Sequence, residues 1–125
     1  MEVKRTERGW AGHYICADYC KFKRNTLLEY GDKKWIVSTV GGHVCDGEIN
    51  SIGYNRWYET MAFRAKEKNG YLEADVERMV PFESEWGIFG EDWQEVLAAY
   101  GEDIDNKANE MHEKVVEELM EKIKE

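Results

Sequence analysis

Apolar and polar side chains alternate in two neighbouring runs between residues 26 and 40, and a Gly31-Asp32 pair separates the runs. Alternation with period two is typical of β-strands, because successive side chains point to opposite faces of the sheet. Glycine at the first central position suits the type II′ turn of a tight hairpin. The pattern therefore predicts a β-hairpin with the cross-strand pairs Glu29 with Lys34 and Leu28 with Trp35.

Both faces of this predicted hairpin carry apolar side chains, Leu27 and Ile36 on one face and Leu28 and Trp35 on the other. A hairpin with a single buried face would instead alternate cleanly between apolar and polar positions. We therefore expect this hairpin to lie centrally in a sheet that is covered on both sides or close to it.

A second hairpin is predicted around Asn69-Gly70, because this dipeptide is the strongest two-residue turn signal. When the flanking runs fold about it, opposite charges face each other on one side of the hairpin and apolar residues on the other. A single register satisfies both sides. The predicted pairs are Arg64 with Asp75, Lys66 with Glu73, Phe63 with Val76 and Ala65 with Ala74.

Less regular segments surround the two hairpins. Residues 41 to 56 are rich in Gly, Asn and Asp, which predicts a connecting loop and two hairpins that are not tightly joined. Upstream, residues 14 to 16 are expected to form another strand within a loosely alternating segment.

After Pro81 the apolar positions recur with a period of about 3.6, which indicates helices. A short amphipathic helix is predicted over residues 93 to 100, before Gly101. Asp105 is expected to cap a longer helix. Its apolar side is predicted to comprise Ala108, Met111, Val115, Val116, Leu119, Met120 and Ile123.

Strands first and helices last predict an α+β fold, an antiparallel sheet built from β-hairpins with two C-terminal helices packed on one face. The length of 125 residues is typical of a single domain. Within it, residues 1–80 form a β-rich part and residues 81–125 an acidic helical part.

The charge is sorted between these two parts. Residues 1–80 hold 13 Lys and Arg against 12 Asp and Glu, whereas residues 81–125 hold 4 against 14. The acidic segment of residues 81–125 repels phosphate, but it can present carboxylates to a basic groove of another macromolecule. Direct binding of nucleic acid is therefore not expected. The one basic cluster, residues 21–25, is interpreted as a protected strand edge or as a surface that attracts an acidic helix.

Location and metal content follow from the same sequence. We expect a cytoplasmic protein without membrane contact, because no apolar run resembles a signal or spans a bilayer. The odd number of cysteines favours reduced thiols in the core. A zinc site is not predicted and no cofactor is expected, since the spacing of the potential ligands is not a recognised one. Those potential ligands are His13, Cys16, Cys20, His43 and Cys45.

No catalytic site is predicted either, and an enzyme is the less favoured interpretation. The residues with suitable chemistry have no spacing that defines a triad or an acid–base pair. They are His13, His43, Ser38, Thr39, Asp75 and Glu59.

Three segments resemble stretches of small uncharacterised accessory proteins of bacterial phages and conjugative elements. They are residues 8–13 (RGWAGH), 24–28 (RNTLL) and 58–63 (YETMAF). This resemblance implies a product that acts on host machinery, similar in composition to anti-CRISPR and anti-restriction inhibitors that occupy nucleic-acid-binding grooves.

Our leading hypothesis is thus a binding protein that inhibits a nucleic-acid-handling defence complex of a bacterial host through its acidic surface. The alternatives are a small enzyme or nucleotide-binding protein with a site near the predicted 41–55 loop, and an acidic helix that only keeps the protein soluble. The residues predicted to contact the basic partner are Glu110, Glu113, Glu117, Glu118, Glu121, Tyr54 and Trp57.

Overall fold

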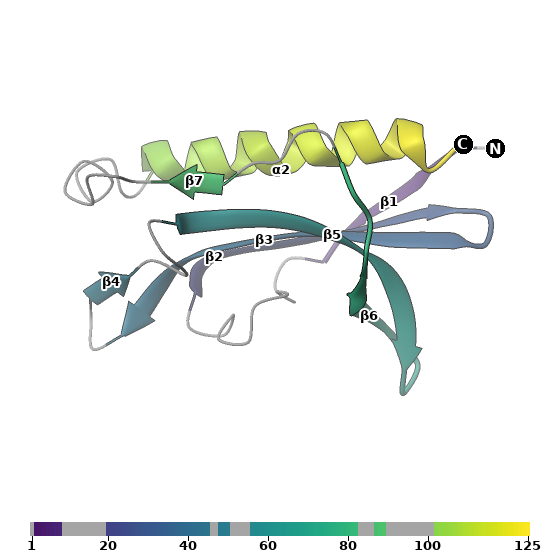
Figure 1. Cartoon of the computed structure of the whole chain (residues 1–125), viewed down its shortest axis with the longest axis horizontal. Helices are drawn as coiled ribbons and strands as arrows, with labels where there is room; N and C mark the ends of the chain where they lie inside the picture. Colours follow the sequence, from purple (N-terminus) through teal and green to yellow (C-terminus); the bar gives the residue numbers. More distant parts are fainter. Residues whose placement is uncertain (1, 9–19, 46–47, 51–55, 83–86, 90–101) are drawn as a thin grey trace.

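In the part of the chain that the structure describes, an antiparallel β-sheet carries one long helix across a face (Figure 1). The computed structural model describes residues 2–8, 20–45, 48–50, 56–82, 87–89 and 102–125. Its elements are β1 (Lys4–Glu7), β2 (Cys20–Tyr30), β3 (Lys33–Cys45), β4 (Glu48–Asn50), β5 (Arg56–Lys68), β6 (Tyr71–Met79), β7 (Gly87–Phe89) and α2 (Glu102–Lys122). The strands follow the order β1-β2-β3-β5-β6, while β4 pairs with β3 and β7 with β5. The chain is therefore an α+β protein, as predicted.

Strands β2 and β3 pair as the alternation predicts. Glu29 lies opposite Lys34, and Leu28 lies opposite Trp35. Gly31 has a φ angle of 61°, which suits the first central position of a type II′ turn. The turn thus sets β2 and β3 in the expected register. The strand order places β3 at the centre of the sheet.

Both faces of the sheet are buried at its centre, in agreement with the apolar positions on both sides of this hairpin. Leu27 and Ile36 are 6% and 0% exposed on the face away from α2. On the other face, apolar side chains of the strands pack against α2 and bury its inner side. This cluster comprises Leu28, Val37, Ala62, Val80, Val115, Val116, Leu119 and Ile123.

The turn between β5 and β6 is also as predicted. Asn69 and Gly70 have φ angles of 53° and 80°, the positive values that a type I′ turn requires at both central positions. Two predicted pairs beside the turn are present, Ala65 with Ala74 and Lys66 with Glu73.

Beyond Ala65, however, the predicted register is wrong. Phe63 is buried, but it pairs with Met79 rather than with Val76, because the register shifts between Phe63 and Ala65. Val76 is 58% exposed instead of facing the core. The predicted pair of Arg64 with Asp75 is likewise absent from the described ladder.

The side chain of Asp75 gives a physical reason for the shift. One of its oxygens accepts a hydrogen bond from the main-chain N–H of Glu77 at 3.2 Å, and the other accepts one from Nε of Arg78 at 2.8 Å. Such local bonds compete with the ladder between strands. They accompany a bulge, which bends β5 and β6 away from α2 (Figure 1).

The prediction of a loop over residues 41–56 is wrong for residues 41–45, 48–50 and 56, which belong to β3, β4 and β5. Gly41 is opposite both Phe22 and Tyr58, whose rings meet edge to face with centroids 5.7 Å apart. Aromatic side chains that cover a strand glycine compensate for its missing side chain. The expectation of loosely joined hairpins is also wrong, because β3 and β5 pair from Trp35 to Gly41.

Outside the two predicted hairpins, the structure differs from the prediction in three respects. Helix α2 begins at Glu102, so Asp105 lies inside the helix instead of capping it. The short strand β7 lies after Pro81, where only helices were expected, and β1 was not predicted at all. The predicted helix over residues 93–100 and the predicted strand at residues 14–16 lie outside the described residues, so α2 is the helix that the structure describes.

Candidate functional site

The side of α2 that points away from the sheet carries three of the predicted partner-binding residues. Glu110, Glu117 and Glu121 are all exposed and, at a spacing of seven and four residues, lie on one side of the helix. Lys114 is exposed among them. We call this group of three carboxylates and one ammonium the outer face of α2.

The remaining predicted contact residues are placed differently. Glu118 is half-buried on the flank of the helix. Trp57 belongs to β5, on another part of the protein from the outer face. Tyr54 lies outside the described residues. Trp57 therefore belongs to the sheet and not to the helix that carries the glutamates.

Glu113 was predicted to contact the basic partner, but its carboxylate already forms ion pairs with two arginines of the sheet. Arg5 of β1 donates to its carboxylate through both terminal nitrogens, at 2.8 and 2.5 Å. Arg24 of β2 donates to it at 2.9 Å and forms two further bonds to Glu7, at 2.7 and 3.2 Å. Arg24 of the basic cluster at residues 21–25 thus binds the acidic helix of its own chain, in agreement with the interpretation of this cluster as a surface that attracts an acidic helix.

These contacts shift the pKa values of both carboxyl groups. Hydrogen bonds from Arg5 and Arg24 lower the pKa of Glu113 to about 2. Burial alone would raise the pKa of Glu7, but hydrogen bonds from Arg24 and Thr26 outweigh it, so this pKa is lowered. Both groups are therefore carboxylates at neutral pH and can only accept hydrogen bonds.

Directly beneath these ion pairs lies a fully buried histidine. His112 occupies the inner side of α2, where apolar residues precede and follow it, and it is 0% exposed. Its two ring nitrogens contact threonines of adjacent strands. Nε2 lies 2.7 Å from Oγ1 of Thr26, and Nδ1 lies 2.8 Å from Oγ1 of Thr39. Thr39 also contacts Oγ1 of Thr60 at 2.7 Å.

The hydrogen bonds from Thr60 through His112 to Glu7 form a series, and the carboxylate of Glu7 at its outer end sets the direction of each one. Glu7 accepts from Thr26 at 2.9 Å, so the single hydroxyl proton of Thr26 points to the carboxylate. Thr26 must then accept from His112, which places the imidazole proton on Nε2. Nδ1 consequently accepts from the Thr39 hydroxyl, and Thr39 accepts from Thr60. We call this ordered chain, from Thr60 to Glu7, the histidine network.

Burial and the neighbouring cation keep His112 neutral. Desolvation is the main reason that its pKa falls from 6.5 to about 4, and the positive charge of Arg24 lowers it further. A neutral imidazole with one donor and one acceptor matches the two threonines. Every polar atom of the ring is therefore satisfied, which allows a histidine to replace an apolar residue at this position.

The histidine network locks the helix onto the sheet in one orientation. Hydrogen bonds are directional, whereas apolar packing alone tolerates sliding and rotation. The contacts to Thr26 and Thr39 fix α2 across β2 and β3, and the ion pairs of Glu113 fix its flank. The outer face of α2 is consequently held in a defined position relative to the rest of the molecule.

No protein-family model, curated protein or solved structure matches this chain. Inference about function therefore rests on the side chains themselves. Two of the three segments that carry the resemblance to mobile-element proteins supply members of the histidine network, Thr26 from one and Thr60 from the other.

The residues considered for catalysis are divided between the two faces of the sheet in the part of the chain that the structure describes, and Ser38 and Glu59 share the face away from α2. Thr39 belongs to the histidine network, while Ser38, the next residue of the strand, is buried on the opposite face of the sheet. Asp75 bonds to Arg78 on β6. His43 lies in β3 opposite Cys20. Of the predicted site near residues 41–55, only strand segments are described.

The described ranges contain no group of three or more histidine, cysteine or acidic residues arranged to hold a metal ion. His13 and Cys16 lie outside them. No helix within these ranges is long and apolar enough to cross a lipid bilayer.

Sequence reasoning missed His112 completely. The signal that could have revealed it is its position, four residues after Ala108 and four before Val116 on the apolar side of the helix. A polar residue at such a position needs buried partners. The threonines that supply them are remote in sequence, and only the sheet register brings them together.

Proposed function

We propose that this protein acts by binding and that it inhibits a nucleic-acid-handling complex of a bacterial host, with the outer face of α2 seated against a Lys/Arg-lined surface of that complex. The observation that carries the proposal is the exposure of Glu110, Glu117 and Glu121 on one side of a helix that the histidine network holds in place. Carboxylates on a rigid element lose little conformational freedom on binding. They therefore suit recognition of a basic groove.

The wider charge distribution supports the same proposal. Residues 81–107 hold 8 acidic residues and 1 basic residue, and residues 108–125 hold 6 and 3. Part of the acidity of α2 is neutralised internally, because Arg5 and Arg24 bind Glu113. The outer face and the acidic segment before it thus supply the negative field that would steer the protein towards a basic partner.

Affinity capture from a bacterial lysate tests the proposal. The wild type is compared with a variant in which Glu110, Glu117 and Glu121 are changed to Gln, a substitution that preserves helix propensity. The proposal requires that the wild type recovers a nucleic-acid-binding complex and that the variant does not.

A further inference from the structure

The two central hairpins separate at one end of the sheet and leave a notch between them. The ladder between β3 and β5 ends at Trp35 and Arg64. Beyond this pair, β3 remains paired with β2, and β5 remains paired with β6. The edges of β3 and β5 that face each other have no strand partner among the described residues. On the β3 side this edge comprises only Lys33 and Lys34, whereas on the β5 side it comprises residues 65–68. The main-chain groups of the β5 segment therefore form the longer row that can bind a ligand.

This notch has a volume of about 380 Å³ and a strongly basic lining. Its walls comprise Asp32, Lys33, Lys34, Trp35, Arg64, Ala65 and Arg78. Among these lining residues, Asp32 alone is acidic. A concave surface lined mainly by one sign of charge concentrates ligands of the opposite sign, even in a chain whose formal net charge is -9.

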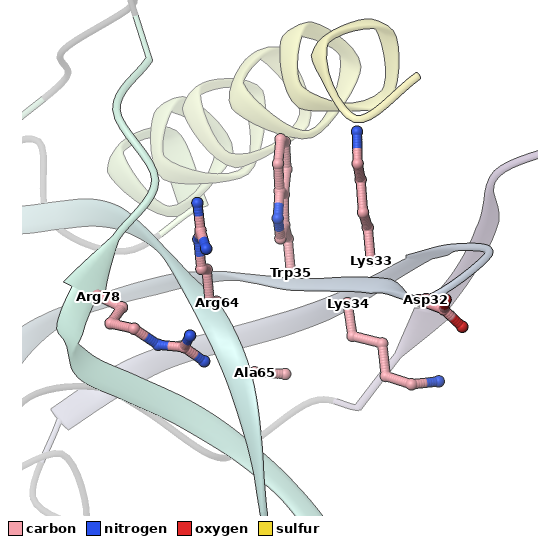
Figure 2. A pocket seen from close by; sticks show the side chains of 7 residues that line it. All are labelled: Asp32, Lys33, Lys34, Trp35, Arg64, Ala65 and Arg78. Atoms are coloured by element: carbon pink, nitrogen blue, oxygen red, sulfur yellow. The ribbon is translucent and has the colours of Figure 1, made fainter. Parts of the chain in front are cut away.

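The basic side chains leave the notch in two directions, as Figure 2 shows. Lys33, Trp35 and Arg64 point towards α2, whereas Lys34 and Arg78 lie on the other side of the sheet. A strand placed in the notch would also direct successive side chains to opposite faces. Acidic side chains on either face of such a strand would meet a cation.

Three of the four basic side chains that line the notch already have hydrogen-bond or ion-pair partners. Lys33 donates to the main-chain oxygens of Ile123 and Glu125, at 3.1 and 3.2 Å. Lys34 pairs with Glu29 at 2.9 Å, and Arg78 pairs with an oxygen of Asp75 at 2.8 Å.

Arg64 is the exception. It is exposed and forms no ion pair with any residue that the structure describes. Its guanidinium group can therefore donate hydrogen bonds to a ligand without first leaving an ion pair among the described residues.

We propose that this notch binds a short acidic segment of a partner protein in an extended conformation, by addition of a strand to the free edge of β5 at residues 65–68, with the first residues of β3 on its other side. An unpaired strand edge presents main-chain carbonyl oxygens as well as N–H groups. A phosphate group can use the donors but repels the acceptors, whereas a peptide satisfies both. Glutamate or aspartate side chains then pair with Arg64 and with the cations on the opposite face.

A titration followed by backbone amide NMR tests this proposal. The probes are a blocked hexapeptide with three glutamates, the same peptide with glutamines in their place, and inorganic phosphate. The glutamate peptide should shift the amide signals of residues 33–35 and 64–66 and bind about tenfold more tightly than its glutamine analogue, since a charge-assisted hydrogen bond is lost with each substitution. No shift at these residues, or equal affinity for both peptides, would refute the proposal.

Two single-charge variants give the matched comparison. Arg64→Gln should weaken binding of the glutamate peptide about tenfold and should leave the fold intact, because Arg64 is exposed and unpaired. Lys23→Gln, opposite Val40 at the other end of β2 and β3, removes the same charge and should leave peptide binding unchanged. Equal affinities of both variants would overturn the role of Arg64 and with it the proposal.

Other occupants of the notch give different results. Inorganic phosphate that shifts the same amides while the peptide does not would show an anion site and refute strand addition. Self-association of the free protein that Arg64→Gln abolishes would show that a second copy fills the notch, which also contradicts a separate partner. None of these outcomes depends on the outer face of α2, so this proposal and the proposed function can fail independently.

Discussion

The hydroxyl of Thr26 lies 2.7 Å from Nε2 of His112, a residue 86 positions further along the chain. This contact joins the sheet to α2 at the centre of the molecule, where both residues are 0% exposed. The hydroxyl proton of Thr26 goes to the carboxylate of Glu7. Thr26 can therefore only accept from the ring, which places the proton of neutral His112 on Nε2. The stability of the protein should therefore depend on the protonation of one histidine.

The first prediction is a loss of stability on mild acidification that depends on His112. Its pKa is about 4 in the folded protein against an ordinary value of 6.5. Between these values the unfolded chain binds a proton that the folded chain does not, so stability falls as the pH falls from 6.5 towards 4. The loss should be on the order of 3 kcal/mol.

Urea denaturation at a series of pH values measures this effect. His112→Gln should be less stable near neutral pH, and the part of the pH dependence between 6.5 and 4 that is due to His112 should disappear. The other ionisable groups contribute to both proteins alike, so the difference between the two curves isolates this histidine. Parallel curves would show that His112 is not buried in its neutral form.

A second prediction compares two threonines of the histidine network. Thr39→Val removes a hydroxyl that bonds to both His112 and Thr60, and leaves Nδ1 of His112 buried without a donor. It should cost about 2 to 3 kcal/mol. Thr60→Val removes only the terminal donor, so about 1 kcal/mol is expected. Equal losses in the free energy of unfolding would contradict the assigned direction of the hydrogen bonds.

A third prediction tests the bulge between β5 and β6. Phe63 is 2% exposed, and Phe63→Ala should cost about 3 to 5 kcal/mol by leaving a cavity in the core. Val76→Ala should change the free energy of unfolding by less than about 0.5 kcal/mol, because Val76 is 58% exposed. A large cost at Val76 would restore the simple register, in which the two residues are neighbours.

The fourth prediction separates structural from surface glutamates. Glu113→Gln breaks the ion pairs with Arg5 and Arg24 and should cost about 1 kcal/mol at low salt, less as salt screens the partly exposed charges. Glu117→Gln should cost nothing measurable, since Glu117 lies on the outer face. Thermal unfolding at low and high salt distinguishes the two; similar midpoints for both variants would show that the arginines contribute no stability.

Local chemistry determined which parts of the fold were predictable. The turns at Gly31-Asp32 and Asn69-Gly70 fix the pairs beside them, because loop length and the sign of φ leave few alternatives. Farther from a turn, other bonds compete with the ladder, and those of Asp75 shift the register. Gly41 appeared to belong to a loop because the two aromatic rings that cover it come from distant strands.

The site was less predictable than the fold for a related reason. Glu110, Glu117 and Glu121 follow from helical periodicity, which is a local property. The pairing of Glu113 with two arginines, and of His112 with two threonines, depends on strand order and on the side of the sheet that the helix covers. Neither is encoded within a single segment.

The central claim, that the outer face of α2 recognises a basic partner, is tested most directly by quantitative affinity capture from a lysate of a bacterium that carries defence systems. The baits are the wild type, the variant with Glu110, Glu117 and Glu121 changed to Gln, and a control with Glu67, Glu73 and Glu77 changed to Gln. The control loses the same charge from the hairpin of β5 and β6.

We expect the wild type and the control to recover the same nucleic-acid-binding complex, with recovery falling as salt is added. The helix variant should recover about tenfold less at low salt, as expected for the loss of three exposed charge pairs. Equal recovery by all three baits at every salt concentration, or recovery of no such complex by the wild type, would contradict the claim.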